Sequence, residues 1–399
     1  MARYLEHPHW IVELVTNRDP NSILEALASN DPERIQEGAW GLGCLGLDQA
    51  TIPLLTRIEH EDAGVRLAVA EALGLIGDPA AAPGLLKLAS DPDPDVRGQV
   101  IWALGACGSP KSIPTLIKSL GDEDMFTDSY GDQEVIGWKA AESLAQLGSA
   151  ALKPLIRATE SKKKIVRENA ARALGYLENP KARDALTMLL KGRSVEVVRA
   201  AINALGAIKS KKAIKDLVPF LKSKKTELRW SAVLALGQIG DKEAVPHLVK
   251  VLESEDDDIR YLVTGAMQNM ADKRVQEALL GCLEERNRVA AGAARALGEL
   301  KVDQAVEALI PLLQDESGEL KLAALGALGN IGSTRSAKAV VAVLEDPDAA
   351  IRAAVCMALS RIPHDISIKA LELTLTDSSK EVRHQAARAL EKITGRSYL

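Results

Sequence analysis

The sequence is poor in aromatic residues, in cysteine and in long apolar runs. Aromatic side chains make up 3% of the 399 residues, which is too little ring volume for the core of a conventional domain of this length. No apolar run reaches the roughly 18 residues that a membrane-spanning helix needs, and the first ten residues lack the pattern of a secretory signal. We therefore expect a soluble, cytoplasmic protein that does not contact membranes.

The four cysteines are widely spaced and form no Cys-x-x-Cys pair. This spacing excludes a disulfide framework and a zinc site. No Ser/His/Asp set, thiolate pair or metal-ligand cluster is visible elsewhere, so the sequence predicts no metal and no tightly bound cofactor.

The formal net charge of −5 argues against a nucleic-acid binder, but the charge is unevenly distributed. Residues 160–229 hold 18 Lys or Arg against 7 Asp or Glu. Two interpretations remain open: a solvated surface, or a contact face for an acidic partner protein.

One unit recurs along the chain with the pattern V-R-x-x-x-x-x-A-L-G-x-I-G, a turn, and A-x-P-x-L-I-x-x-L. The residues equivalent to the last residue of Ala-Leu-Gly, here called the markers, are spaced by 31 residues in most intervals and by 40 in one. The markers are Gly43, Gly74, Gly105, Ala145, Gly175, Gly206, Gly237, Gln268, Gly298, Gly329, Ser360 and Glu391. The period leaves room for two helices of about 11 residues and two tight turns.

Each unit carries the signals of a helix pair. Acidic residues such as Asp62, Asp93 and Asp258 precede the Val-Arg helix as caps, and glycines follow it as stops. The second helix begins with a proline at a constant offset, at Pro83, Pro114, Pro154 and Pro246. Because one pair cannot bury its apolar stripe alone, stacking must supply the core. We predict an all-α fold, an α-solenoid of about twelve two-helix repeats, with an N-terminal cap and first outer helix in residues 1–30 and one continuous solenoid domain over 31–399.

The repeats resemble the short HEAT-like repeats of the phycobilisome-lyase group. In such repeats the Val-Arg helix lines the concave side and the Pro helix the convex side. Six of the twelve aromatic residues fall at positions of the inner helix that stacking does not need, several times more than random placement gives; these are Trp40, Trp102, Trp138, Tyr176, Trp230 and Tyr261. Exposed rings interleaved with charges of both signs favour a surface for a planar, acid-bearing ligand or for a partner, while rings that fill gaps between neighbouring helices are the alternative.

The one long interval contains an acidic insertion at residues 121–135 with Phe126 and Tyr130. Insertions in solenoids fall in loops, often on the binding face. We expect it to project at a mouth of the groove, between Trp102 and Trp138.

Two stretches, Arg34–Gly43 and Val96–Gly105, together with the insertion and its Tyr–Gly pair, are similar to the opening of the E/F-type phycobilin lyases. The resemblance implies a lyase or bilin-carrying chaperone. Such a protein binds a phycobilin as substrate and attaches this open-chain tetrapyrrole to a cysteine of a phycobiliprotein subunit, an acidic protein; some members also isomerise the bilin. It implies stacking by Trp40, Trp102, Trp138 and Tyr176, propionate binding by Arg172 and Arg199, proton transfer by Glu142 or Asp128, and a lid at Tyr130. Trp230 and Tyr261 complete the expected ligand-binding set. The alternative is a HEAT-repeat scaffold that binds a protein without chemistry; the sequence does not indicate the oligomeric state.

Overall fold

The computed structural model describes residues 8–398, and within them α-helices alternate between two rows. The helices of the first row, which we call the inner row, carry the markers within them or directly after them: α3 (Pro32–Leu45), α5 (Ala63–Ile76), α7 (Pro94–Ala106), α9 (Ile136–Gln146), α11 (Lys164–Tyr176), α13 (Val195–Ala207), α15 (Thr226–Ile239), α17 (Asp257–Met267), α19 (Arg288–Glu299), α21 (Gly318–Ile331), α23 (Ala349–Leu359) and α25 (Lys380–Thr394). These twelve helices confirm the predicted repeats.

The second row consists of shorter helices, which we call the outer row. Its members are α2 (Pro20–Leu27), α4 (Thr51–Leu55), α6 (Ala82–Leu88), α8 (Ile113–Ser119), α10 (Ser149–Ala158), α12 (Arg183–Leu189), α14 (Ile214–Leu217), α16 (Val245–Val251), α18 (Lys273–Cys282), α20 (Val306–Leu309), α22 (Ala337–Ala342) and α24 (Asp365–Thr374), and α1 (His9–Thr16) packs at the start of the chain. Two short strands, β1 (Met125–Thr127) and β2 (Gln133–Val135), form an antiparallel hairpin within the insertion.

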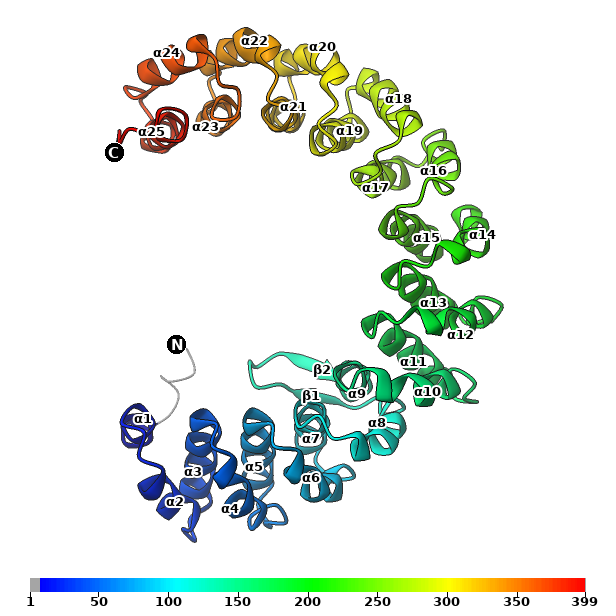
Figure 1. The fold of residues 1–399 in the computed structure, drawn as a ribbon, viewed down its shortest axis with the longest axis vertical. Coiled ribbons are helices and arrows are strands. Elements are labelled where there is room, and N and C mark those ends of the chain that lie inside the picture. Colours follow the sequence, from blue (N-terminus) through cyan, green and yellow to red (C-terminus); the bar gives the residue numbers. More distant parts are fainter. Residues whose placement is uncertain (1–7, 399) are drawn as a thin grey trace. The chain divides into compact units, whose positions relative to one another are not determined.

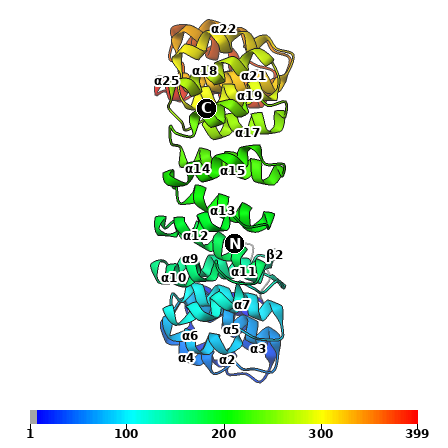
Figure 2. The ribbon, with the colours of Figure 1, turned by 90° about the vertical axis from the view of Figure 1, so that its right-hand side faces the viewer.

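The chain divides into two compact units, Met1–Ser210 and Lys211–Leu399. Within each unit the inner row lies on the concave side and the outer row on the convex side (Figure 1), as the repeat pattern predicts. Figure 2 shows α10 with α11 and α12 with α13 as successive layers of the first unit. In the described part of the chain, no helix is both long and apolar enough to cross a lipid bilayer.

Local signals set the ends of the inner helices. The side chain of Asp62 accepts a hydrogen bond from the Val65 N–H (2.9 Å), and Asp93 accepts one from the Asp95 N–H (2.8 Å). The expected cap at Asp258 is wrong by two residues: Asp256 caps α17, and Asp258 lies in the first turn, where its charge favours the helix dipole. Seven inner helices are followed by a glycine with positive φ, at Gly46, Gly77, Gly108, Gly148, Gly240, Gly332 and Gly395; the first and last of these add to the predicted stops.

The outer helices are shorter than the sequence suggests because a 3-10 turn often precedes them. Residues Pro79–Ala81 form such a turn before α6, and Pro83 then lies in the first turn of the helix. The prediction is wrong for Pro154, which lies inside α10. Gly148 ends the preceding segment with φ of 62°, so α10 begins directly at Ser149 without a 3-10 turn.

Small residues allow neighbouring inner helices to approach closely. A Cβ added to Gly298 would lie 2.6 Å from the Cα of Ala327 in the next repeat, and one added to Gly43 would lie 2.8 Å from the Cα of Ala72. Real side chains do not tolerate such distances, so glycine is a steric requirement at these two markers. This close approach explains how a chain with few aromatic residues fills its core.

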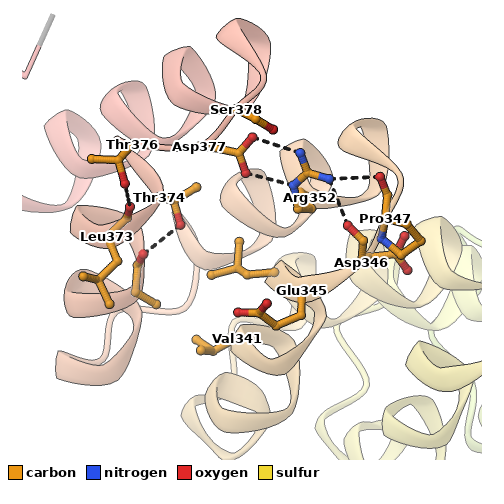
Figure 3. A pocket seen from close by; sticks show the side chains of 12 residues that line it. Val341, Glu345, Asp346, Pro347, Arg352, Leu373, Thr374, Thr376, Asp377 and Ser378 are labelled. Atoms are coloured by element: carbon orange, nitrogen blue, oxygen red, sulfur yellow. Dashed lines mark hydrogen bonds and ion pairs between the residues drawn. The ribbon is translucent and has the colours of Figure 1, made fainter.

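A second device connects neighbouring repeats, and we call it the clasp. In α23, Arg352 donates from Nη1 to the backbone carbonyls of Asp346 and Pro347 (2.9 and 3.1 Å), and from Nε and Nη2 to the two carboxylate oxygens of Asp377 in the next repeat (2.8 and 2.9 Å; Figure 3). Arg66 makes the same pattern with Asp91, at 2.7 and 2.9 Å. Such two-bond pairing of guanidinium and carboxylate is strong and directional. Where it is present, the clasp thus fixes an inner helix to the loop that follows its outer neighbour.

The clasp predicts a pH-dependent loss of stability in Asp377→Asn. The hydrogen bonds from Arg352 lower the pKa of Asp377 to about 2. A carboxyl group whose pKa is lower in the folded than in the unfolded state stabilises the fold above its unfolded pKa, and this contribution disappears as the pH falls through about 2. We expect the free energy of unfolding of Asp377→Asn to be about 2 kcal/mol below wild type at neutral pH, with the difference narrowing from about pH 4 downward.

Urea unfolding at a series of pH values measures this difference. Asp365→Asn is the matched control, because Asp365 is an exposed aspartate of the neighbouring α24 outside the clasp. A difference between wild type and Asp377→Asn that stays constant down to the lowest pH would contradict the role of the carboxylate.

Candidate functional site

The six inner aromatic residues all lie on or at the start of inner-row helices, but they differ in environment. Trp40, Trp102, Trp138 and Tyr176 belong to the first unit, and Trp230 and Tyr261 to the second.

Two of the first set are packing residues. Trp40 is 7% exposed, so the expectation of an accessible ring is wrong there. Trp102 lies against the neighbouring repeat: a Cβ added to Gly74 would come within 2.2 Å of its ring. These rings fill space beside small residues, which is the alternative that the sequence left open.

The other two rings of the first unit are half exposed on the inner row. Trp138 on α9 is 45% exposed and Tyr176 at the end of α11 is 50% exposed. The guanidinium of Arg172, also on α11, lies 4.8 Å from the centre of the Trp138 ring, within the range of a cation–π contact. The structure therefore brings two of the predicted residues, Trp138 and Arg172, into contact, and Tyr176 lies one turn further along α11.

Charged residues surround these rings. Arg172 forms an ion pair with Glu168 at 3.6 Å, and Glu168 is buried. Lys139 lies between Glu142 on its own helix (2.8 Å) and Glu134 of the hairpin (2.7 Å). Burial alone would lower the pKa of Lys139, but the hydrogen bonds to both glutamates raise it. We call the set Trp138, Lys139, Glu142, Glu168, Arg172 and Tyr176 the Trp138 cluster.

The insertion is a hairpin fixed to the inner row. Phe126 of β1 is 1% exposed and its ring lies on Gly98 of α7, where an added Cβ would come within 2.0 Å. The Thr127 N–H donates to the carboxylate of Asp95 (2.7 Å). Figure 1 shows both strands on the concave side of the first unit, beside α7 and α9. The sequence analysis missed this strand pair because its anchor, Gly98, lies 28 residues before Phe126.

The two hairpin residues with a predicted role lie at its turn. The carboxylate of Asp128 accepts hydrogen bonds from the N–H groups of Tyr130 (2.7 Å) and Asp132 (2.9 Å), so it builds the turn. The Tyr130 side chain is 85% exposed at the tip. Its proposed lid role therefore rests on a residue that the fold leaves accessible.

The remaining predicted residues lie elsewhere. Arg199 is exposed on α13. In the second unit, Trp230 is half exposed on α15, and Tyr261 lies under Arg288 (4.7 Å from the ring centre) and accepts a hydrogen bond from Arg295 (3.2 Å). Tyr261 and Arg295 also line a pocket of about 420 Å³.

Another pocket recurs with the repeat. Figure 3 shows the pocket of about 520 Å³ beside the Arg352 clasp, lined by Val341, Glu345 and Leu373. An equally large pocket lies beside Arg97 and Asp122 in the first unit. Because the same hollow appears at equivalent places, it belongs to the repeat architecture rather than to a specific site.

The cysteine thiols are poor nucleophiles where they are buried. Burial raises the pKa of Cys107 to about 11 and that of Cys356 to about 12. Among residues 8–398, no group of three His, Cys, Asp or Glu side chains is arranged to hold a metal ion. The chemistry available at the Trp138 cluster is stacking, charge pairing and hydrogen bonding.

The sequence model of HEAT repeats matches residues 20–91, 82–128, 131–206, 189–268, 250–318, 277–349 and 306–391. These overlapping segments extend over most of the chain. The chain belongs to the HEAT-repeat family. The HEAT-repeat assignment agrees with the predicted α-solenoid and with the paired helices of the structure. Among curated proteins, none is similar enough in sequence to count as a match.

Solved structures share the fold. An importin-β structure has a TM-score of 0.58 at 13% identity, covering 96% of this chain and 68% of that one. A Kap95p structure with RanGDP has a TM-score of 0.58 at 13% identity and coverage of 95% and 56%. Kap121p bound to the extreme C-terminus of the phosphatase Cdc14p has a TM-score of 0.58 at 14% identity and coverage of 96% and 50%. The chain thus spans about half to two thirds of these relatives, and none of the three is a phycobilin lyase.

The anchored hairpin makes a prediction for Phe126→Ala. Loss of this buried ring leaves a cavity over Gly98 and is expected to lower the free energy of unfolding by about 3 kcal/mol. It is also expected to release the hairpin, so that limited proteolysis cuts within residues 121–135 faster than in wild type. Tyr130→Ala is the control, because its ring is exposed and its loss leaves the anchor intact. Equal cleavage rates for Phe126→Ala and wild type would show that Phe126 does not hold the hairpin.

Proposed function

We propose that this HEAT-repeat chain is a protein-binding scaffold and that a segment of the partner lies across the Trp138 cluster. The observation that carries the proposal is the half-exposed Trp138 ring with Arg172 stacked on it. Leaving an indole ring in water forgoes about 2–3 kcal/mol of burial. Trp, Tyr and Arg are the residues on which binding energy concentrates in protein interfaces.

The charges of the cluster support a partner with both apolar and polar groups. The ion pair between Arg172 and Glu168, at 3.6 Å, is longer than a hydrogen bond. The Nε atom of Arg172 is buried and has no acceptor among the described residues. The Arg172 side chain is 26% exposed, so a carbonyl or carboxylate of a bound segment would meet its accessible part rather than the buried Nε.

The structural relatives support a protein partner through their fold. The Kap121p structure is bound to the extreme C-terminus of another protein, and the Kap95p structure concerns RanGDP. We propose for this chain the mode of binding and not the partners of these relatives: a protein segment is bound along the row of inner helices that a solenoid of paired helices presents.

A second proposal is that the cluster binds a phycobilin, in keeping with the lyase resemblance. The specific observation is again the flat Trp138 ring next to a guanidinium, an arrangement suited to a conjugated ligand with propionates. The structure supports binding more than catalysis. The carboxylate of Glu142 accepts a hydrogen bond from Lys139, and that of Asp128 accepts hydrogen bonds from backbone amides of the turn, so both expected proton donors already have partners. Delivery to a phycobiliprotein subunit remains part of this second proposal.

Selection of peptides from a random display library against the purified chain tests the scaffold proposal. We expect selected peptides to lose about thirtyfold or more in affinity for Trp138→Ala, as hot-spot residues do. Met188→Ala on the outer row is the control, since Met188 is 63% exposed on the other side of the same unit. Peptides that bind Trp138→Ala as tightly as wild type would refute the proposed surface.

The same two variants test the bilin proposal. Production of the chain in cells that make phycobilins should yield a coloured protein, and Trp138→Ala but not Met188→Ala should abolish the visible absorbance band. A colourless wild-type protein from several bilin backgrounds would refute this second proposal and leave the first unaffected.

A further inference from the structure

Within residues 8–398, one basic clasp position that is followed by another repeat has no acid. Seven inner helices that are followed by another repeat carry Arg or Lys at the clasp position, eight residues before the marker: Arg66, Arg97, Arg167, Arg229, Arg260, Lys321 and Arg352. Six of them pair with an acidic residue in the loop that follows the next outer helix: Asp91, Asp122 with Asp124, Asp256, Glu285, Asp346 and Asp377. Within residues 8–398, Arg167 has no carboxylate partner within ion-pair distance.

Arg167 is nevertheless held in the clasp orientation. Its Nη1 donates to the backbone carbonyls of Ser161 (2.7 Å) and Lys162 (3.0 Å), six and five residues earlier. Arg66 is held by carbonyls at the same offsets. In Arg66 and Arg352 the opposite edge of the guanidinium, formed by Nε and Nη2, donates two hydrogen bonds of 2.7–2.9 Å to a carboxylate. The corresponding edge of Arg167 has no acceptor among the described residues.

Arg167 lacks a carboxylate partner because of a single position in the next loop. Asp91 lies 25 residues after Arg66 in the sequence. The residue 25 positions after Arg167 is Gly192, which has no side chain to pair with the guanidinium. The Gly192 N–H donates to the Leu189 carbonyl at 3.0 Å, as the Asp91 N–H donates to Leu88 at 3.0 Å. The loop therefore makes the same turn, and only the acidic side chain is missing.

Basic residues lie on both loops beside Arg167. Lys162 and Lys163 in one loop and Lys191 and Arg193 in the next are exposed. The two loops are neighbours, since Lys164 forms an ion pair with Glu196 at 3.3 Å, near the starts of α11 and α13. Lys163 is the N-cap of α11 and makes no side-chain cap bond. A lysine there forgoes about 1 kcal/mol of capping and is repelled by the helix dipole.

Lys224 and Lys225 lie in the same way beside Arg229, but there Asp256 supplies an acid from the next loop. The acids that line a pocket with Lys163, among them Asp122 and Asp124, come instead from the preceding repeat.

We propose that the edge formed by residues 161–164 and 190–194 binds an acidic segment of a partner protein. One carboxylate of that segment lies on Nε and Nη2 of Arg167, in the place that Asp91 takes beside Arg66, and the lysines hold neighbouring acids. A carboxylate is favoured over a phosphate because carboxylates occupy this same fork in the other repeats. The edge lies at the start of α11, whereas Arg172 and Tyr176 of the Trp138 cluster lie in its later turns. Glu168, the cluster residue next to Arg167, is buried, so the two sites expose different side chains and are tested independently.

Gly192→Asp is the decisive variant, because it supplies from within the carboxylate that the proposal assigns to the partner. Gly192 has no positive φ, and an added Cβ meets only the Leu189 carbonyl, at 3.1 Å. The variant is expected to fold and to melt at a higher temperature than wild type, since it completes the clasp. Gly281→Asp is the matched control: it makes the same change of charge at an exposed helical glycine with open space around its Cβ.

Fluorescence anisotropy with a labelled polyglutamate peptide measures the binding. We expect wild type and Gly281→Asp to bind alike, Gly192→Asp to bind about tenfold or more weakly, and Arg167→Lys to lose affinity because lysine lacks the two-bond fork. A polyglutamine peptide should not bind. Unchanged affinity in both Gly192→Asp and Arg167→Lys would overturn the proposal. A single-stranded oligonucleotide that binds more tightly than polyglutamate and is displaced by Gly192→Asp would overturn the protein partner and assign a phosphate instead.

Discussion

The clasp between a basic residue of one repeat and an acid of the next is the directional interaction that joins six of the inner helices to the repeat that follows. The marker glycines let the inner helices meet, but close packing of small residues is not directional. The two-bond pairing of Arg66 with Asp91, and of Arg352 with Asp377, sets the register of one repeat on the next. The insertion respects this rule: Arg97 pairs with Asp122 and Asp124, and the hairpin strands begin only after both acids.

Trp138 and Arg167 are two residues at which the chain departs from its own repeat pattern. If every joint of a solenoid is built alike, a residue that departs from the pattern without a packing reason points to function. The Trp138 ring departs in this way, since Trp102 in the preceding repeat covers Gly74 whereas Trp138 is half exposed under Arg172. Arg167 also departs from the repeat pattern, because it is the clasp arginine that has no carboxylate partner among the described residues of the next repeat. The two departures differ in chemistry, one aromatic and one purely electrostatic, and therefore suit different parts of a partner.

Much of the fold could be predicted from the sequence because the signals are local. The period, the Asp caps and the glycine stops lie within a few residues of the helix ends that they define. The environment of each ring could not be predicted, since it depends on a neighbour in another repeat, as Trp102 depends on Gly74 and Phe126 on Gly98. The clasp acids were visible in the sequence, and a recurring acid 25 residues after the arginine was the signal that could have identified them. The break at Gly192 then follows from the sequence alone.

Hydrogen exchange at the first amides of the inner helices tests the central claim most directly. In a complete clasp the acid also accepts a hydrogen bond from the N–H two residues later, as Asp91 does from Asp93 (3.0 Å) and Asp377 from Ser379 (2.7 Å). At the joint after Arg167 the equivalent amide is that of Ser194, and Gly192 offers it no carboxylate. We expect the Ser194 amide to exchange faster than those of Asp93 and Ser379. Equal protection at all three amides would show that the clasp does not fasten the repeats.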